Sequence, residues 1–214
     1  MKSETAWFAE RRIRSEFVAN RLGKYLGGSL LDVGCDQAYL KELLKPSRYL
    51  GVDLGGKPDM ILNLDEVDKL PFEDQEFQSV VCCDVLEHLN RFHFIFGELL
   101  RVAGRHVVIS LPNNWTNARR PIEKGRGKIG HYGLPLEVPM DRHKWFFSLE
   151  DASVFVENKA PDYGFKVVES FATEKPRSGL SRVIRKSLTK SKMCYLNRYA
   201  HTYWAVLLRK NHSS

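Results

Sequence analysis

Short apolar runs that end in glycine or a polar residue alternate with helix-forming segments along most of this chain. Each run has the length of a buried strand, and most are followed by a segment with helical spacing of apolar residues. Strands that alternate with helices predict a parallel sheet covered by helices on both faces. The predicted strands lie at 29–34, 49–53, 59–63, 79–83, 106–110, 164–172 and 202–209. The predicted helices lie at 4–22, 38–45, 84–103, 149–159 and 180–190.

Size and composition place the chain among ordinary globular proteins. Its 214 residues fit one domain, so residues 1–214 are expected to fold as a single unit. Hydrophobic residues at 43% and charged residues at 28% argue against disorder, and no apolar stretch approaches the roughly 18 residues of a spanning helix. The charged N-terminus argues against a signal peptide, and the four cysteines include no C-x-x-C pair. We therefore expect a cytoplasmic protein without a transmembrane segment.

The most informative motif runs from residue 31 to residue 40 and reads LDVGCDQAYL. It predicts a strand, a tight turn at Gly34 and a helix, so that a ligand can approach the backbone. Asp53 ends the next strand, 19 positions after Gly34, where its two oxygens can accept both hydroxyls of a ribose. The turn lacks the G-x-G-x-x-G pattern of dinucleotide enzymes, and Asp36 would repel a phosphate. These features favour an adenosine ligand without phosphate.

The same run resembles motif I of the class I S-adenosylmethionine-dependent methyltransferases, in which an acidic residue precedes G-x-G-x-G. Five segments further along the chain resemble later motifs of this family, and they occur in the same order. These segments are residues 70–77 (LPFEDQEF), 79–89 (SVVCCDVLEHL), 109–113 (ISLPN), 143–148 (HKWFFS) and 164–165 (GF). The resemblance covers about residues 25–172 and is greatest for the methyltransferase domain 11/23 group. It implies S-adenosyl-L-methionine as cofactor. It also implies a Rossmann-like α/β fold with a doubly wound, mostly parallel, seven-stranded sheet whose last strand is antiparallel.

The resemblance further implies which residues hold the cofactor. Backbone contacts near the sulfonium are expected from Gly34 and Cys83, and support of the aminocarboxylate end from Asp32. For the adenine, either Asn63 or Asp65 matches the acid of the family. The complete predicted set is Asp32, Gly34, Cys35, Asp36, Ala38, Asp53, Leu54, Asn63, Leu64, Asp65, Cys83 and Asp84.

Two positions depart from the glycines of motif I, namely Asp36 and Ala38. Asp36 is the more serious departure if its position needs a positive φ, although aspartate tolerates that region better than most residues. Its carboxylate would either clash with the methionine carboxylate of the cofactor or hold the ammonium group. An alternative is therefore a non-catalytic methyltransferase-like domain that binds a partner, because fold does not imply function.

Asp84, Glu87 and His88 form the pattern D-x-x-E-H at the start of a predicted helix. This spacing lets three ligands converge, and some relatives with a similar pattern bind a divalent metal at this place. Acidic residues in a first helical turn are also favoured by the helix dipole without any ion. We expect no metal and keep these three residues as weak candidates.

Residues 111–147 form an unusually long connection, which we interpret as a substrate or lid loop over the active-site opening. His131 and His143 are the candidate general bases, because histidine can take up a proton near neutral pH. For His143, anchoring of the loop is the preferred interpretation over catalysis.

Positive charge is concentrated near the C-terminus, where ten lysine and arginine residues but no acid follow Glu174. Residues 175–200 form a basic segment before the last strand, and the apolar positions of the helix at 180–190 share one face. This face is expected to pack on the sheet, with contact to an anionic membrane or to RNA as alternatives.

Together these features predict a methyltransferase that acts on an oxygen or nitrogen atom of a small acceptor, either anionic or linked to an anionic scaffold. The basic residues of the 111–147 segment favour negative charge on the acceptor. An RNA methyltransferase is a less favoured alternative, because strand 79–83 leads into Asp84-Val85-Leu86 rather than the N/D-P-P-F/Y motif of many such enzymes.

Overall fold

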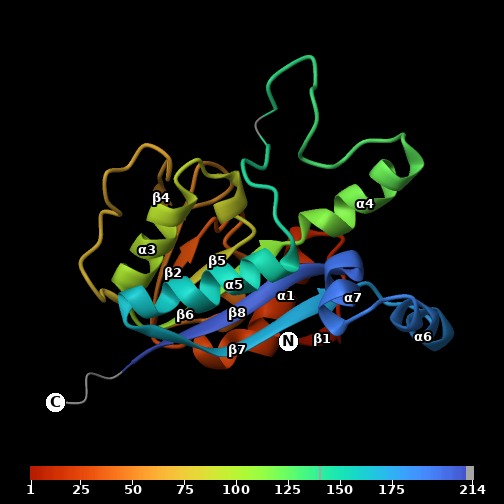
Figure 1. Cartoon of the computed structure of the whole chain (residues 1–214). Coiled ribbons are helices and arrows are strands. Elements are labelled where there is room, and N and C mark those ends of the chain that lie inside the picture. Colours follow the sequence, from red (N-terminus) through yellow and green to blue (C-terminus); the bar gives the residue numbers. More distant parts are fainter. Residues whose placement is uncertain (140, 211–214) are drawn as a thin grey trace.

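The computed structural model describes residues 1–139 and 141–210. Its centre is an eight-stranded sheet in the order β1-β7-β8-β6-β5-β2-β3-β4 (Figure 1). Neighbouring strands are parallel except where β8 runs antiparallel to β6 and β7. The doubly wound, mostly parallel sheet and its antiparallel last strand are thus confirmed. The strands are β1 (Lys2–Thr5), β2 (Ser29–Val33), β3 (Arg48–Asp53), β4 (Met60–Ile61), β5 (Phe77–Cys83), β6 (Ala103–Pro112), β7 (Phe165–Glu174) and β8 (Ala200–Arg209).

The sheet has one strand more than the seven predicted. Residues 2–5, which the sequence assigns in part to a helix over 4–22, form β1 and pair in parallel with β7. The helix begins only at Arg11. A four-residue edge strand shows too few alternations to be recognised, so the prediction for this end of the chain was wrong.

The helices lie in the connections between the strands. The helix predicted over 84–103 is shorter than expected, because Asp84 has a positive φ of 53° and a 3₁₀ turn at Leu86–His88 comes first. None of the helices in the described part of the chain has the length and apolarity needed to span a membrane. The α-helices are α1 (Arg11–Leu22), α2 (Tyr39–Leu44), α3 (Phe92–Val102), α4 (Asn114–Lys124), α5 (Leu149–Lys159), α6 (Gly179–Ser187) and α7 (Lys192–Tyr199).

Helices cover both faces of the sheet, as predicted. On one face, α3, α5 and α7 pack into a core that includes Ile95, Leu149 and Leu196. On the other face, α1 and α2 contribute Leu22 and Leu40 to a second core. Burial of apolar surface on both faces stabilises the sheet at roughly 25 cal/mol per Å². The packed sheet therefore holds the ends of the loops at its carboxyl edge in fixed positions.

The segment 111–147 is not one long loop, in contrast to the sequence interpretation. It contains α4, and apart from Asn113 only the described residues between Gly125 and Ser148 lack helix and strand (Figure 1). The side-chain amide of Asn113 donates to the backbone carbonyl of Ala200 at 2.8 Å, which fixes the start of α4 beside α7. The helix escapes prediction because Pro121 lies inside it.

The basic segment forms two helices rather than one. The first, α6, overlaps the helix predicted at 180–190, but no residue of it is buried, so the expected packing of its apolar face on the sheet was wrong. The second, α7, was not predicted, and its buried residues include Tyr195, Leu196 and Tyr199. Helix α7 therefore occupies the covering position that the sequence assigned to α6.

Candidate active site

The carboxyl ends of β2, β3, β5 and β6 meet at one edge of the sheet, because these strands are parallel neighbours. After β2, the chain forms β3 on one side of β2 and later forms β5 on the other side of β2. Ligands of doubly wound folds bind at such a switch point. Gly34, Asp53 and Cys83 lie where these strands end, so the candidate site is at this edge.

The turn after β2 has alternate residues in the left-handed region, with φ of 78° at Gly34, 49° at Asp36 and 54° at Ala38. These are the three positions where the resembling family has glycine. A Cβ atom at Gly34 would collide with Cγ2 of Val85, so this position needs glycine for space as well as conformation. An L-residue in this region costs roughly 1–2 kcal/mol, which applies to Asp36 and Ala38.

Asp53 ends β3 and ties this turn to the sheet. Its Oδ2 accepts the backbone N–H of Asp36 at 2.8 Å, and its Oδ1 accepts the N–H of Leu54 at 2.6 Å. The N–H of Lys57 donates in turn to the carbonyl of Asp36 at 2.6 Å. The carboxylate is half-buried and lies beside the turn, where the sequence predicts an acid for the ribose. The side chain of Leu54 is mostly exposed.

The carboxylate of Asp36 forms an ion pair with Arg11, at 2.9 Å between Oδ1 and Nη1. Arg11 lies at the start of α1 and was not identified by sequence reasoning. This ion pair compensates the negative charge that Asp36 introduces at a position where the family has an uncharged glycine. Asp36 thus has a partner within the chain, in addition to the two cofactor groups considered from the sequence.

Two predicted site residues lie inside the core beside the turn. Asp32 accepts the hydroxyl of Tyr49 at 2.7 Å, and burial raises the pKa of its carboxyl to about 7 against the effect of this hydrogen bond. Burial also raises the pKa of Cys35 to about 12, which keeps the thiol protonated. A protonated thiol is a poor nucleophile.

Of the two candidates for the adenine contact, Asp65 is already engaged. Its carboxylate accepts the backbone N–H groups of Asn90 and Arg91, the two residues before α3, at 3.2 and 3.1 Å. Asn63 accepts the N–H of Asp65 through Oδ1 at 3.1 Å, which leaves its amide nitrogen for another partner. Leu64 between them is buried. The geometry favours Asn63 of the two.

Asp84 follows β5 and points toward α1. Its carboxylate accepts the hydroxyl of Ser110 at 2.6 Å and forms an ion pair with Arg14. Burial lowers the pKa of Arg14, but attraction to Asp84, Cys83 and Glu87 together with the hydrogen bond to Asp84 outweighs this effect, and the pKa is raised. Sequence reasoning missed Arg14, although Arg11 and Arg14 lie one helical turn apart and share a face. Burial raises the pKa of the preceding thiol, Cys83.

The segment after α4 places both predicted bases against the 3₁₀ turn that follows β5. The rings of His131 and His143 stack with their centroids 4.3 Å apart. The ring of His88 lies edge-on to that of His143, with 4.6 Å between the centroids. Asp141 bridges two of these rings, since its Oδ2 is 3.2 Å from Nδ1 of His131 and its Oδ1 is 3.3 Å from Nδ1 of His88. We call these four residues and Glu87 the histidine cluster.

Glu87 is the buried acid of the histidine cluster. Its Oε2 has no hydrogen-bond partner among the described residues, and burial raises its pKa well above the usual value. Glu87, His88 and His143 each offer one ligand atom within 4.8 Å of the others, as a metal site requires. The weak candidate set from the sequence is therefore corrected, because Asp84 is turned away and His143 takes its place.

The two predicted bases differ in their surroundings. His143 is buried, and its Nδ1 lies 3.1 Å from the amide nitrogen of Asn114, whose Oδ1 accepts the N–H of Phe147 at 3.1 Å. Burial, together with repulsion from His88 and His131, lowers the pKa of His143 to about 4. The side chain of His131 is 40% exposed, and its φ of 63° is in the left-handed region.

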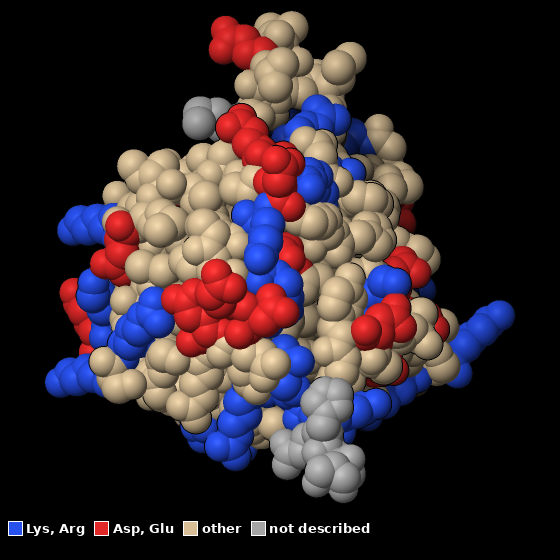
Figure 2. All heavy atoms as spheres, turned by 90° about the vertical axis from the view of Figure 1, so that its left-hand side faces the viewer, with Lys and Arg blue, Asp and Glu red and all other residues tan. Residues whose placement is uncertain are grey.

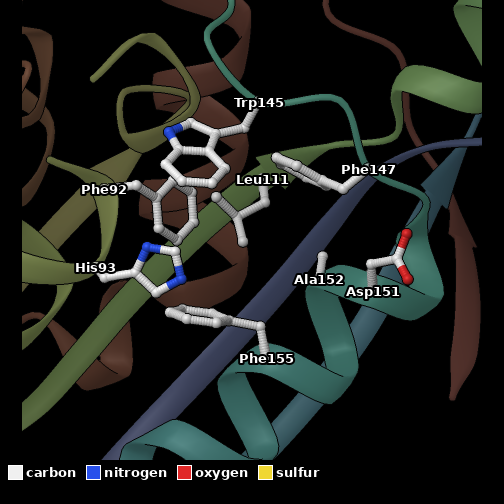
Figure 3. A pocket seen from close by; sticks show the side chains of 8 residues that line it. All are labelled: Phe92, His93, Leu111, Trp145, Phe147, Asp151, Ala152 and Phe155. Carbon is white, nitrogen blue, oxygen red and sulfur yellow. The ribbon is translucent and has the colours of Figure 1, made fainter. Parts of the chain in front are cut away.

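A pocket of about 160 Å³ lies between α3 and α5 (Figure 3). Its one acid, Asp151, is engaged in the cap of α5, where it accepts the N–H and hydroxyl of Ser148 at 2.9 Å. Trp145 donates its indole N–H to the carbonyl of Leu89 at 2.7 Å. The lining is mainly aromatic and suits an apolar group; it consists of Phe92, His93, Leu111, Trp145, Phe147, Asp151, Ala152 and Phe155.

Comparison with protein families gives a match to a model described as a methyltransferase domain, over residues 8–170. The chain belongs to this methyltransferase family. The class I S-adenosylmethionine-dependent methyltransferase expected from the motifs is thereby confirmed, with S-adenosylmethionine as cofactor. A comparison with curated proteins gives no significant match.

Several solved methyltransferases share the fold. An S-adenosylmethionine-dependent methyltransferase from Archaeoglobus fulgidus is 18% identical, with a TM-score of 0.59 and coverage of 95% of this chain and 96% of that chain. Magnesium protoporphyrin IX methyltransferase from Synechocystis PCC 6803 with bound SAH is 14% identical, with a TM-score of 0.55 and coverage of 96% and 90%. The small RNA methyltransferase HEN1 is 17% identical, with a TM-score of 0.60 and coverage of 100% and 27%.

The left-handed turn predicts an unusual effect of glycine. Ala38→Gly should raise the free energy of unfolding by about 1 kcal/mol, because glycine adopts a positive φ without steric cost. Ala160→Gly is the matched control: φ is −58° there, so glycine should lower the free energy of unfolding by about 1 kcal/mol or more. Urea denaturation measures both values. A destabilised Ala38→Gly protein would contradict the turn geometry.

Asp53 allows a direct test of the cofactor site. Asp53→Ala should weaken S-adenosylmethionine binding by roughly 1.5–3 kcal/mol, about tenfold or more, because buried ribose hydroxyls would lose their acceptor. Asp53→Asn keeps the shape and one acceptor oxygen, so its affinity should lie between those of wild type and Asp53→Ala. Calorimetry measures the affinity, and thermal unfolding checks that each variant folds. Unchanged affinity in a folded Asp53→Ala protein would refute the ribose assignment.

Proposed function

We propose that this methyltransferase transfers the methyl group of S-adenosylmethionine to an oxygen or nitrogen atom of an anionic acceptor. The acceptor would enter beneath the segment 111–147. The observation that carries the proposal is the pair of His131 and Asp141, which this segment brings to the carboxyl end of β5. A base oriented by a carboxylate at this edge suits an acceptor that must lose a proton.

The residues at the carboxyl edge suit the cofactor. The half-buried carboxylate of Asp53 is placed to accept ribose hydroxyls, and the turn at Gly34 lets a ligand approach the backbone. Arg11 and Arg14 reach this edge from α1, and a guanidinium binds a carboxylate such as that of the methionine moiety. When bound, S-adenosylmethionine supplies an activated methyl group on a sulfonium. The chain must then align the acceptor, exclude water and take up its proton.

We assign the role of general base to His131. Its Nδ1 is held by Asp141, so Nε2 remains for the proton of the acceptor, and the carboxylate would stabilise the imidazolium. The left-handed backbone of His131 also fits a functional position, where such strain is often maintained. His143 has a buried ring and a lowered pKa, and we assign it the anchoring role because it stacks on His131.

Positive charge on the segment 111–147 and just after β7 supports an anionic acceptor. Burial lowers the pKa of Lys175, and repulsion from Arg177 and Arg120 lowers it further, so these cations from two separate segments lie near one another. Glu123 is the only acid between residues 113 and 136. The basic residues of that part of the chain are Arg119, Arg120, Lys124, Arg126 and Lys128.

Methyl transfer from labelled S-adenosylmethionine tests this function. We would offer carboxylates and phosphate monoesters that carry a hydroxyl or amino group and, separately, single-stranded and duplex RNA. Label should reach at least one small anion, at a rate that falls with ionic strength because the Debye length is only about 10 Å at 0.1 M salt. His131→Ala should lower kcat by about 100-fold while cofactor affinity stays unchanged. His106→Ala, at the other end of β6, is the matched control.

The outcomes of this assay separate the alternatives. Label on RNA alone would replace the proposal by the RNA methyltransferase, a class to which one of the similar structures belongs. Cofactor binding without transfer to any acceptor would favour a non-catalytic binding domain.

We also propose that Glu87, His88 and His143 hold a divalent cation. The supporting observation is the unpartnered Oε2 of Glu87, which is buried beside two imidazoles. One carboxylate and two imidazoles form a ligand set that suits Zn²⁺ and leaves an open position. A cation here would stabilise the ionised carboxylate of Glu87 and lower the pKa of an acceptor hydroxyl.

Calorimetric titration with Zn²⁺ alone tests this site. Wild type should bind one ion, and His88→Ala should bind it at least tenfold more weakly because one of three ligands is lost. His93→Ala removes an imidazole outside the cluster and should bind as wild type does. Absence of binding to wild type, or equal binding to the His88→Ala protein, would contradict the cation site.

A further inference from the structure

Helix α6 exposes a continuous apolar stripe. None of its nine residues is buried. Leu180, Val183, Ile184 and, just after the helix, Leu188 are 73%, 65%, 50% and 70% exposed. Positions spaced by three, four and eight residues share one face of a helix, so these side chains form a single stripe. Single exposed apolar residues are common on proteins, whereas a contiguous patch marks an interaction surface.

An ordinary surface helix turns its apolar face to the protein and its charged face to solvent, whereas α6 does the opposite. Its basic face is turned to the body of the protein: Arg182 donates to the hydroxyl of Thr5 at 2.7 Å, and the guanidinium of Arg185 lies 4.6 Å from the ring centre of Tyr199. Both arginines are half-buried. The apolar stripe lies on the opposite side of the helix and faces away from the protein. Figure 1 shows α6 beyond α7, at the end of the molecule and apart from the sheet.

The charged residues of the segment that carries α6 are all basic. Lys186, Lys190 and Lys192 are exposed on and next to the helix. No acidic residue follows Glu174 in the sequence, so this part of the chain offers no local counter-charge. The opposite side of the molecule is different, since Figure 2 shows acidic and basic side chains intermixed there. The segment that carries the exposed stripe therefore contributes positive charge only.

An apolar stripe edged by cations fits an anionic lipid surface. The stripe can enter the boundary between headgroups and acyl chains while lysines at its edges meet the headgroups. RNA would use the cations but leaves four apolar side chains without a partner. We propose that α6 docks this methyltransferase on an anionic lipid bilayer, with Leu180, Val183, Ile184 and Leu188 inserted. This docking is independent of the acceptor and of the cation site.

Sedimentation with lipid vesicles tests the docking on the full chain. Wild type should bind vesicles of phosphatidylcholine with 30% phosphatidylserine and should bind at least tenfold more weakly to pure phosphatidylcholine, because the cations need anionic headgroups. The double variant Val183→Asn and Ile184→Asn should lose at least tenfold in binding to the anionic vesicles. Both side chains are exposed, so thermal unfolding should be unchanged.

The matched control carries the same substitutions elsewhere. Val154 on α5 and Val168 on β7 are 54% and 41% exposed, and the double variant Val154→Asn and Val168→Asn should bind the anionic vesicles as wild type does. Failure of wild type to bind these vesicles would overturn the proposal. Equal binding by the Val183→Asn and Ile184→Asn protein would also overturn it, because attraction of charges alone would then explain the binding.

Discussion

The hydrogen bond from the backbone N–H of Asp36 to the carboxylate of Asp53 is the contact on which the proposed site depends. It joins the turn after β2 to the end of β3, the two places that a nucleoside ligand would contact. The turn is left-handed at three alternate positions, and such a backbone persists only where its surroundings hold it. Because we also assign the ribose to Asp53, a single side chain would both fix the turn and bind the ligand.

Helix α1 and the segment after α4 complete the site from opposite directions. From α1, Arg11 and Arg14 pair with the acids that follow β2 and β5. The side chain of Arg11 is 67% exposed in this pair, and ion pairs near the surface contribute little to stability, so exchanging its partner for a ligand carboxylate would cost little. From the other direction, Asp141 and His131 reach the turn after β5. The proposed cofactor site and the proposed base therefore meet where β5 ends.

Local sequence signals predicted the central strands, the turn at Gly34 and the acid at Asp53, because each depends on a short run of residues and its period. They failed where distant residues decide the outcome. Helix α4 contains a proline, and β1 exists only because β7 offers an edge to pair with. The orientation of α6 depends in part on Thr5, which lies far from it in sequence. The convergence of His143 with Glu87 likewise depends on the path of a long segment, which no local motif encodes.

A crystal structure with S-adenosylhomocysteine tests the central claim most directly. The account predicts the ribose hydroxyls on the carboxylate of Asp53, the ligand against the backbone at Gly34, and its amino acid carboxylate near Arg11 or Arg14. A ligand bound away from the carboxyl edge of β2 and β3 would contradict the account. A carboxylate of Asp53 that contacts only the turn, with the ribose held elsewhere, would contradict it as well.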